Sequence, residues 1–150
     1  MKAKSKKLNL SVQYMVGGDN LPSRPQLRKW ALAALARRAQ ITLRIVGEKE
    51  GRALNRDFLG RDYATDVLTF TYPERRPLAG DIALCAPVVT REAREQGISL
   101  KAHYAHLVVH GVLHLQGYDH DRAAAAQLME SLESEIVTQL GYPDPHAVQA

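Results

Sequence analysis

Residues 110–120, HGVLHLQGYDH, constrain this chain most, because they combine three histidines with a glycine suited to end a helix. His110 and His114 are four residues apart, so on a helix their imidazoles lie on one face, about 6 Å apart. Gly117 can adopt the left-handed conformation that ends a helix and lets His120 turn back toward the pair. Three ligands and one open position are typical of a catalytic zinc site. The segment therefore predicts one Zn²⁺ per chain, held by His110, His114 and His120.

The same spacing occurs in a large class of zinc proteases, which carry a glutamate directly after the first histidine. Here that residue is Gly111, so the usual general base for peptide hydrolysis is absent from the sequence. A zinc-bound water held by the three histidines, with a pKa lowered to about 7, would still supply a hydroxide at neutral pH. A metalloprotease-like hydrolase is thus an alternative that the missing glutamate disfavours.

Two neighbouring residues are candidates for supporting roles. His106 shares the helical face, but its eight-residue separation from His114 is about 12 Å along the axis, so the two cannot share an ion. We expect His106 to face substrate or support a ligand, and a half-exposed histidine without a role is the alternative. Asp119 is a candidate outer carboxylate that orients a ligand histidine, or else a capping residue for the following helix.

Hydrophobic periodicity predicts an α+β domain. The expected strands and helices follow one another in the order β-α-β-α-β-β-α-α-α. This order predicts a small mixed four-stranded sheet packed with about five helices, with the zinc site on a helix in the C-terminal half. The expected strands are 8–14, 41–46, 66–72 and 81–86, and the expected helices are 23–38, 48–60, 87–96, 99–117 and 121–141.

The length of 150 residues suits one domain, which we place at 8–150 after a basic, flexible tail at 1–7. A single cysteine, Cys85, excludes an internal disulfide and favours the cytoplasm, and we expect its side chain to be buried. The sequence shows no apolar run long enough for a signal peptide or a membrane span, so no membrane partner is expected.

The charge is unevenly distributed along the chain. Residues 1–61 hold 14 Lys and Arg against 4 Asp and Glu, a net +10, whereas residues 62–150 hold 6 against 12, a net −6. The basic first part predicts a surface for a polyanion, and a solvated basic face is the alternative.

Three blocks resemble the bacterial YbeY family of endoribonucleases, and the resemblance covers nearly the whole chain. They are LNRDFLGRDYATDVLTF at 54–70, GDIAL at 80–84 and HLVVHGVLHLQGYDH at 106–120, followed by LGYPDP near the C-terminus. The resemblance implies a zinc-dependent hydrolase that cuts single-stranded RNA, in maturation of the 3′ end of 16S rRNA and in ribosome quality control. It implies rRNA, and the small ribosomal subunit or assembly factors, as partners, with no DNA, and it assigns the three histidines as zinc ligands.

The sequence departs from the family at one position of the first block. The family has an arginine thought to face the active site where this chain has Leu59. Such an arginine would hold a phosphate or stabilise transition-state charge, so Arg56 and Arg61 are candidate substitutes for substrate binding. Each could equally be a solvated arginine. A non-catalytic ribosome assembly factor with a structural zinc is the remaining alternative.

Overall fold

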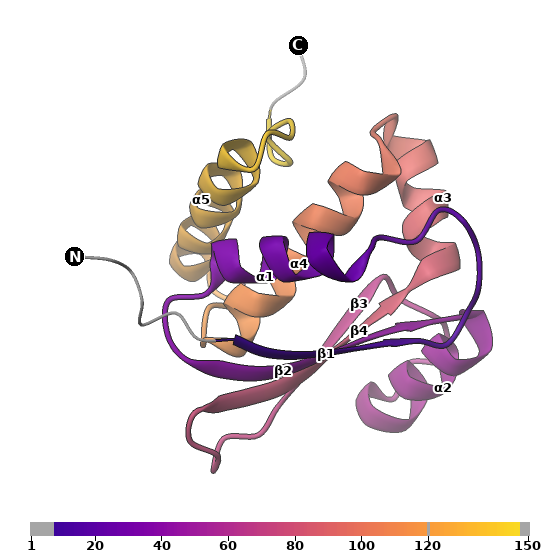
Figure 1. Ribbon diagram of the computed structural model, residues 1–150, viewed down its shortest axis with the longest axis horizontal. Coiled ribbons are helices and arrows are strands. Elements are labelled where there is room, and N and C mark those ends of the chain that lie inside the picture. The colour runs from indigo at the N-terminus through magenta and orange to yellow at the C-terminus, as the bar shows by residue number, and fades with distance from the viewer. Residues whose placement is uncertain (1–7, 120, 148–150) are drawn as a thin grey trace.

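The computed structural model describes residues 8–119 and 121–147, which form a four-stranded sheet and five helices (Figure 1). The predicted α+β class is confirmed, whereas the tail predicted at 1–7 lies outside the described residues. In chain order the elements are β1 (Leu8–Tyr14), α1 (Arg24–Ala34), β2 (Ala39–Val46), α2 (Glu48–Leu59), β3 (Val67–Thr71), β4 (Leu78–Cys85), α3 (Ala86–Gln96), α4 (Leu100–Leu115) and α5 (Ala123–Gln139).

The sheet is mixed, as predicted, with the strand order β1-β2-β4-β3. β1 pairs parallel with β2, β2 pairs parallel with β4, and β3 is antiparallel to β4. Helices α1 and α4 lie over one face of this sheet with α5 packed beyond them, whereas α2 lies against the opposite face (Figure 1). None of the described helices is long and apolar enough to cross a membrane.

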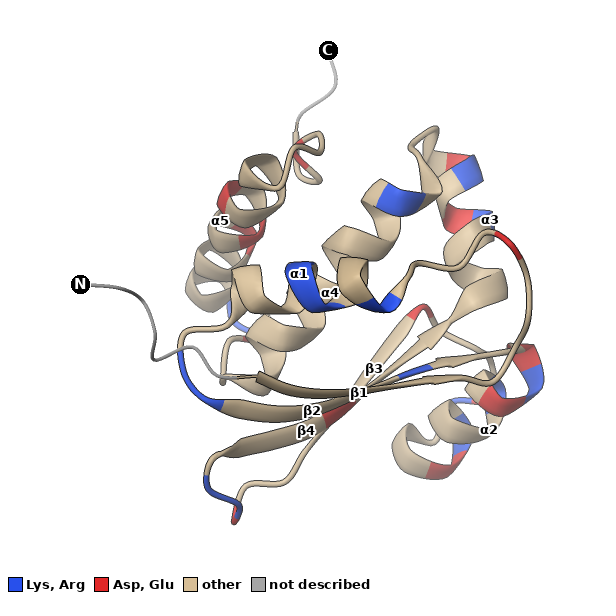
Figure 2. Ribbon diagram, in the orientation of Figure 1, with Lys and Arg blue, Asp and Glu red and all other residues tan. Residues whose placement is uncertain are grey.

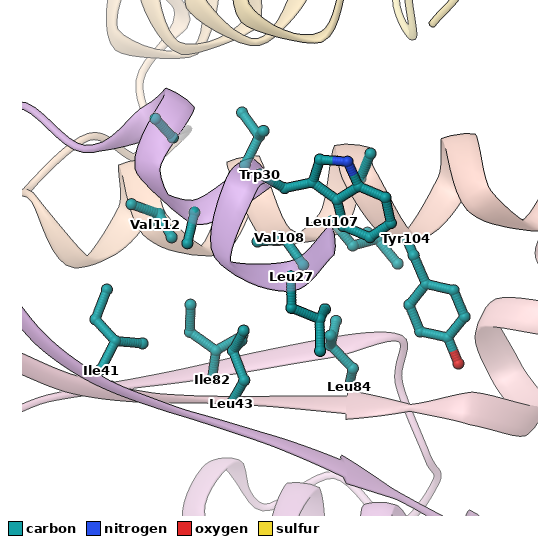
Figure 3. Packing of buried hydrophobic residues seen from close by; sticks show 14 of the residues in the cluster. Leu27, Trp30, Ile41, Leu43, Ile82, Leu84, Tyr104, Leu107, Val108 and Val112 are labelled. Atoms are coloured by element: carbon teal, nitrogen blue, oxygen red, sulfur yellow. The ribbon is translucent and has the colours of Figure 1, made fainter. Parts of the chain in front are cut away.

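Helix α4 is the centre of the hydrophobic core. Eleven of its sixteen residues are buried, because the helix packs against α1, α3, α5 and the sheet at once. Figure 3 shows Leu107, Val108 and Val112 of this helix meeting Leu27 and Trp30 of α1, above the apolar side chains of β2 and β4. A helix enclosed in this way is held in place on several sides, which suits it to carry a site.

Two glycines bring α4 and β4 into close approach. A Cβ on Gly80 would lie 2.5 Å from Leu115 Cδ2, and a Cβ on Gly111 would lie 3.0 Å from Ile82 Cδ1. Gly111 therefore faces the sheet, and Ile82 fills the space that a side chain would need. The position that carries the base in zinc proteases has no room for a glutamate in this fold.

Four predicted helix boundaries are confirmed by their capping residues. Ser23 forms a capping box with Gln26, and the side chain of Ser99 accepts a hydrogen bond from the Ala102 amide. Gly60 and Gly97 end α2 and α3 in the left-handed conformation. The prediction that Cys85 is buried is also confirmed.

Several boundaries differ from the prediction by two or more residues. α1 ends at Ala34 instead of continuing to residue 38, because the amide group of Gln116 accepts a hydrogen bond from Ala36 N–H and donates one to the Ala34 carbonyl. β4 begins at Leu78 instead of 81, because pairing with β2 extends its ladder. The last helix begins at Ala123, with Arg122 rather than Asp121 as its N-cap, and this cap has no side-chain hydrogen bond.

Candidate metal centre

Four histidines follow one another along α4. The ring centroids of His103 and His106 are 6.4 Å apart, those of His106 and His110 are also 6.4 Å apart, and those of His110 and His114 are 6.3 Å apart. The planes of His110 and His114 differ by only 8°. The predicted histidine-rich face of this helix is therefore present, with its last two imidazoles parallel.

The orientation of His114 follows from the turn that ends α4. Gly117 adopts φ 104°, which turns the chain so that the Tyr118 carbonyl lies 2.9 Å from His114 Nδ1. A carbonyl oxygen can only accept a hydrogen bond, so Nδ1 carries a proton, and in the corresponding neutral tautomer Nε2 carries the lone pair. His120, the third predicted ligand, lies outside the described residues.

His110 is oriented by a carboxylate from another helix. Its Nδ1 lies 2.5 Å from Oε2 of Glu133, which comes from α5 and is only 2% exposed. An ionised carboxylate can only accept a hydrogen bond, so His110 Nδ1–H is the donor, and in the neutral tautomer the lone pair is again on Nε2. A carboxylate behind a histidine is the arrangement that orients metal ligands in many zinc sites. The pair His110 and His114 therefore fits a divalent metal ion.

Glu133 also binds two further histidines. Its Oε1 lies 2.9 Å from His106 Nε2 and 2.5 Å from Nε2 of His146, in the segment after α5. Burial by itself raises the pKa of Glu133, but the hydrogen bonds from His106, His110 and His146 outweigh burial and hold the pKa well below its ordinary value. Glu133 is therefore ionised, and three imidazoles surround it.

Sequence reasoning missed Glu133, although the chain contained a signal for it. Met129, Glu133 and Val137 are spaced four apart and are the buried residues of α5. A carboxylate in the apolar stripe of a helix needs a buried partner, because an isolated charge in the core is costly. The histidine-rich face of α4 was the available partner.

His106, Glu133 and His146 are candidate metal-binding residues, because their ligand atoms lie within 4.8 Å of one another. The three residues line a pocket of about 240 Å³ together with His110 and residues at the start of β3. The imidazoles of His106 and His146 both direct Nε2 at Oε1 of Glu133. Hydrogen bonds to Glu133 therefore also account for this arrangement without an ion.

A second group of this kind lies near the start of α4. Asp66, Glu92 and His103 also have ligand atoms within 4.8 Å of one another. His103 is buried, and its Nε2 lies 2.9 Å from Glu92 Oε1. Burial raises the pKa of Glu92, and the nearby Asp66 carboxylate adds to this while the His103 hydrogen bond opposes it.

The structure places the predicted substrate arginines away from α4. Arg56 lies on α2, against the opposite face of the sheet, and pairs with Asp57 at 3.1 Å (Figure 1). Arg61 follows the end of α2 and is exposed, as is Leu59 at 54%. Within the part of the chain that the structure describes, no hydrogen bond joins either arginine to the histidines.

Asp119 makes a local contact, because its side chain accepts a hydrogen bond from the Asp121 amide at 3.3 Å. This is a turn interaction. Its predicted role behind a ligand histidine stays a prediction.

The fold and the site define a class of protein, an α+β domain with candidate metal-binding residues gathered on a buried helix. A sequence model described as "Endoribonuclease YbeY" matches residues 25–141. The endoribonuclease YbeY of Nitrosomonas europaea is 56% identical over 142 residues, covering 95% of this chain and 87% of that protein. The endoribonuclease YbeY of Methylobacillus flagellatus is 59% identical over 141 residues, covering 94% and 95% respectively.

Among solved structures, the solution structure of TM1509 from Thermotoga maritima is similar, with a TM-score of 0.55 and 25% identity. The similarity covers 93% of this chain and 99% of that chain. The chain therefore belongs to the endoribonuclease YbeY family, whose members are RNA-cleaving hydrolases.

Proposed function

We propose that this protein is a zinc-dependent endoribonuclease that cuts single-stranded RNA. The observation that supports this most strongly is the pair His110 and His114, whose Nδ1 hydrogen bonds direct both Nε2 lone pairs away from their partners. The proposed role is maturation of the 3′ end of 16S rRNA and ribosome quality control. This role requires RNA and the small ribosomal subunit or its assembly factors as partners, in the cytoplasm.

The proposed ligands of one zinc ion per chain are His110, His114 and His120. A zinc ion bound by these residues would supply Lewis-acid chemistry, namely polarisation of a phosphoryl oxygen and acidification of water near neutral pH. Glu133 holds the His110 ring and its tautomer, and the Tyr118 carbonyl does the same for His114.

His106 is partly buried and lines a pocket together with His110, where it is held by Glu133 and can contact the substrate. Arg56 and Arg61 remain proposed substrate contacts on the α2 side. Asp119 remains a proposed support for His120.

Peptide hydrolysis is disfavoured by the packing of Gly111. The general base of that reaction would have to stand where Ile82 contacts the helix. Phosphodiester cleavage would not need that base, because a bound zinc ion would supply the acidified water and cationic groups would hold the phosphate.

The decisive experiment measures bound zinc and cleavage of a structured rRNA fragment in three proteins: wild type, His114→Ala and His146→Ala. We expect His114→Ala to lose both zinc and cleavage, and His146→Ala to keep stoichiometric zinc. Full cleavage by a His114→Ala protein without metal would overturn the zinc mechanism. If only His146→Ala loses zinc, the ion binds instead at the group formed by His106, Glu133 and His146.

A non-catalytic assembly factor is the second candidate, favoured by the uncharged Leu59 at the end of α2. Leu59→Arg tests it, with Leu59→Gln as the uncharged control. If Leu59→Arg raises cleavage and Leu59→Gln does not, the lack of a guanidinium group at this position limits an existing nuclease activity. If every protein lacks cleavage but still binds the small subunit, the assembly-factor function is correct.

A further inference from the structure

Four arginines from two distant parts of the chain line one surface pocket. Arg37 and Arg38 lie in the loop between α1 and β2, and Arg75 and Arg76 lie in the loop between β3 and β4. The pocket has a volume of about 520 Å³. Figure 2 shows basic residues in both loops, at the same end of the molecule. The two loops therefore concentrate positive charge at one place.

This charge is not neutralised within the described residues. Arg44, Arg52 and Arg56 each form an ion pair with a carboxylate, but none of the four pocket arginines does so within 8–119 and 121–147. All four are exposed, and no Asp or Glu is among the described residues that line the pocket. Unpaired guanidinium groups in a concave surface attract a polyanion, since phosphate oxygens match their donors.

The residues that directly follow His114 contact the first loop and the strand that follows the second loop. The Gln116 side chain bonds to the backbone of Ala34 and Ala36 at 2.8 Å each, which holds the Arg37–Arg38 loop against the end of α4. Leu115 packs against Gly80 of β4, where a Cβ would lie only 2.5 Å away. The end of α4 therefore holds the first loop and packs against β4, and Leu115, Gln116 and Gly117 line the same pocket as the four arginines.

The β3–β4 loop is itself ordered by local contacts. The Arg75 guanidinium lies 5.4 Å from the centre of the Tyr72 ring, and the Arg75 amide donates to the Tyr72 carbonyl. Arg76 Nη1 donates to the Arg75 carbonyl at 3.1 Å. Arginines held in this way lose less freedom when they bind a phosphate.

We infer that Arg37, Arg38, Arg75 and Arg76 bind the phosphate backbone of single-stranded RNA and lead it to the histidines of α4. The inference rests on the proposed nuclease function and names the surface that holds its substrate. It also places the cationic contacts on the α4 side of the sheet, whereas Arg56 lies on α2 and is paired with Asp57.

The test compares two double variants, Arg37→Ala/Arg38→Ala and Arg75→Ala/Arg76→Ala. Each is made in a His114→Ala background so that the RNA stays uncut. Binding of a fluorescein-labelled 12-nucleotide single-stranded RNA is followed by anisotropy between 50 and 300 mM KCl. The matched control removes two exposed arginines from α3, Arg91→Ala/Arg94→Ala.

For single strands each lost phosphate contact lowers the slope of log K against log salt by about 0.7, so each pocket pair should lower it by about 1.4. The corresponding affinity loss is about 10- to 30-fold at 0.1 M salt. The control pair should keep the wild-type slope. An unchanged slope in both pocket pairs, or an equal loss in the control, would overturn the inference.

Cleavage separates this inference from the proposed function. In otherwise wild-type proteins that keep His114, the pocket pairs should raise KM for RNA cleavage while kcat stays at its wild-type value. Normal cleavage with an unchanged KM would reject the pocket and leave the nuclease function intact. Loss of RNA binding by the pocket pairs, in a protein that cuts no RNA, would support the pocket and reject the nuclease.

Discussion

The replacement Glu133→Gln isolates the contribution of the buried carboxylate on α5. Glutamine keeps the size of the side chain and one acceptor oxygen, but it replaces the second oxygen by an NH₂ group. Oε1 of Glu133 serves His106 and His146, and Oε2 serves His110. An amide oxygen turned toward the first two histidines leaves its NH₂ facing the Nδ1 proton of His110. At least one imidazole therefore loses its acceptor, whichever way the amide turns.

The expected cost is a loss of zinc affinity. Removing a carboxylate that orients a metal-bound histidine typically lowers affinity 10- to 100-fold. This corresponds to about 1.4 to 2.7 kcal/mol.

The assay is a competitive zinc titration against a chromophoric chelator at pH 7.5. Glu135→Gln is the matched control, because Glu135 lies on the same helix and is exposed. We expect Glu135→Gln to bind zinc like wild type. Wild-type affinity in Glu133→Gln would refute the reasoning, since the hydrogen bond to His110 would then have no part in preparing the site.

Three further predictions concern packing and stability. Gly80→Ala should lower the free energy of unfolding by about 1–3 kcal/mol in urea titrations, because its Cβ would meet Leu115 at 2.5 Å; an unchanged midpoint would contradict this close approach. Gln116→Ala should cost about 1–2 kcal/mol and speed amide exchange in the Arg37–Arg38 loop, because two backbone groups lose their partner. Burial raises the pKa of Tyr104 to about 12 in the folded protein. Because the folded state then holds the phenol proton more tightly than the unfolded chain, its contribution to the free energy of unfolding is full below pH 10 and is lost as the pH rises toward 12. Wild type should therefore lose about 2 kcal/mol across that window while Tyr104→Phe does not, and equal losses would contradict the assignment.

The features that could be predicted from the sequence are those decided by neighbouring residues. Serine caps such as Ser99, glycine ends such as Gly97 and the four-residue spacing of His110 and His114 depend on one helical segment, and each was read correctly. The α+β class followed from the order of such segments. The family resemblance supplied what local chemistry could not, namely the choice of RNA as substrate.

The features that were missed depend on contacts between distant segments. Glu133 reaches His110 across 23 residues, and nothing near Glu133 in the sequence indicates which buried partner it has. The end of α1 depends on Gln116, which is 80 residues from Ala36. Such pairings are set by how helices pack on the sheet, which periodicity alone does not specify.

The packing of Gly111 against Ile82 has a consequence for redesign. A single substitution to glutamate would place a carboxylate in the core, at a cost of several kcal/mol, instead of beside the proposed zinc ligands. Space for it would first have to be made on β4, for example by Ile82→Ala, which removes a fully buried side chain and destabilises the sheet that seats α4. The path from this scaffold to a peptidase therefore passes through a poorly folded intermediate, so laboratory evolution that selects one mutation at a time should not find it.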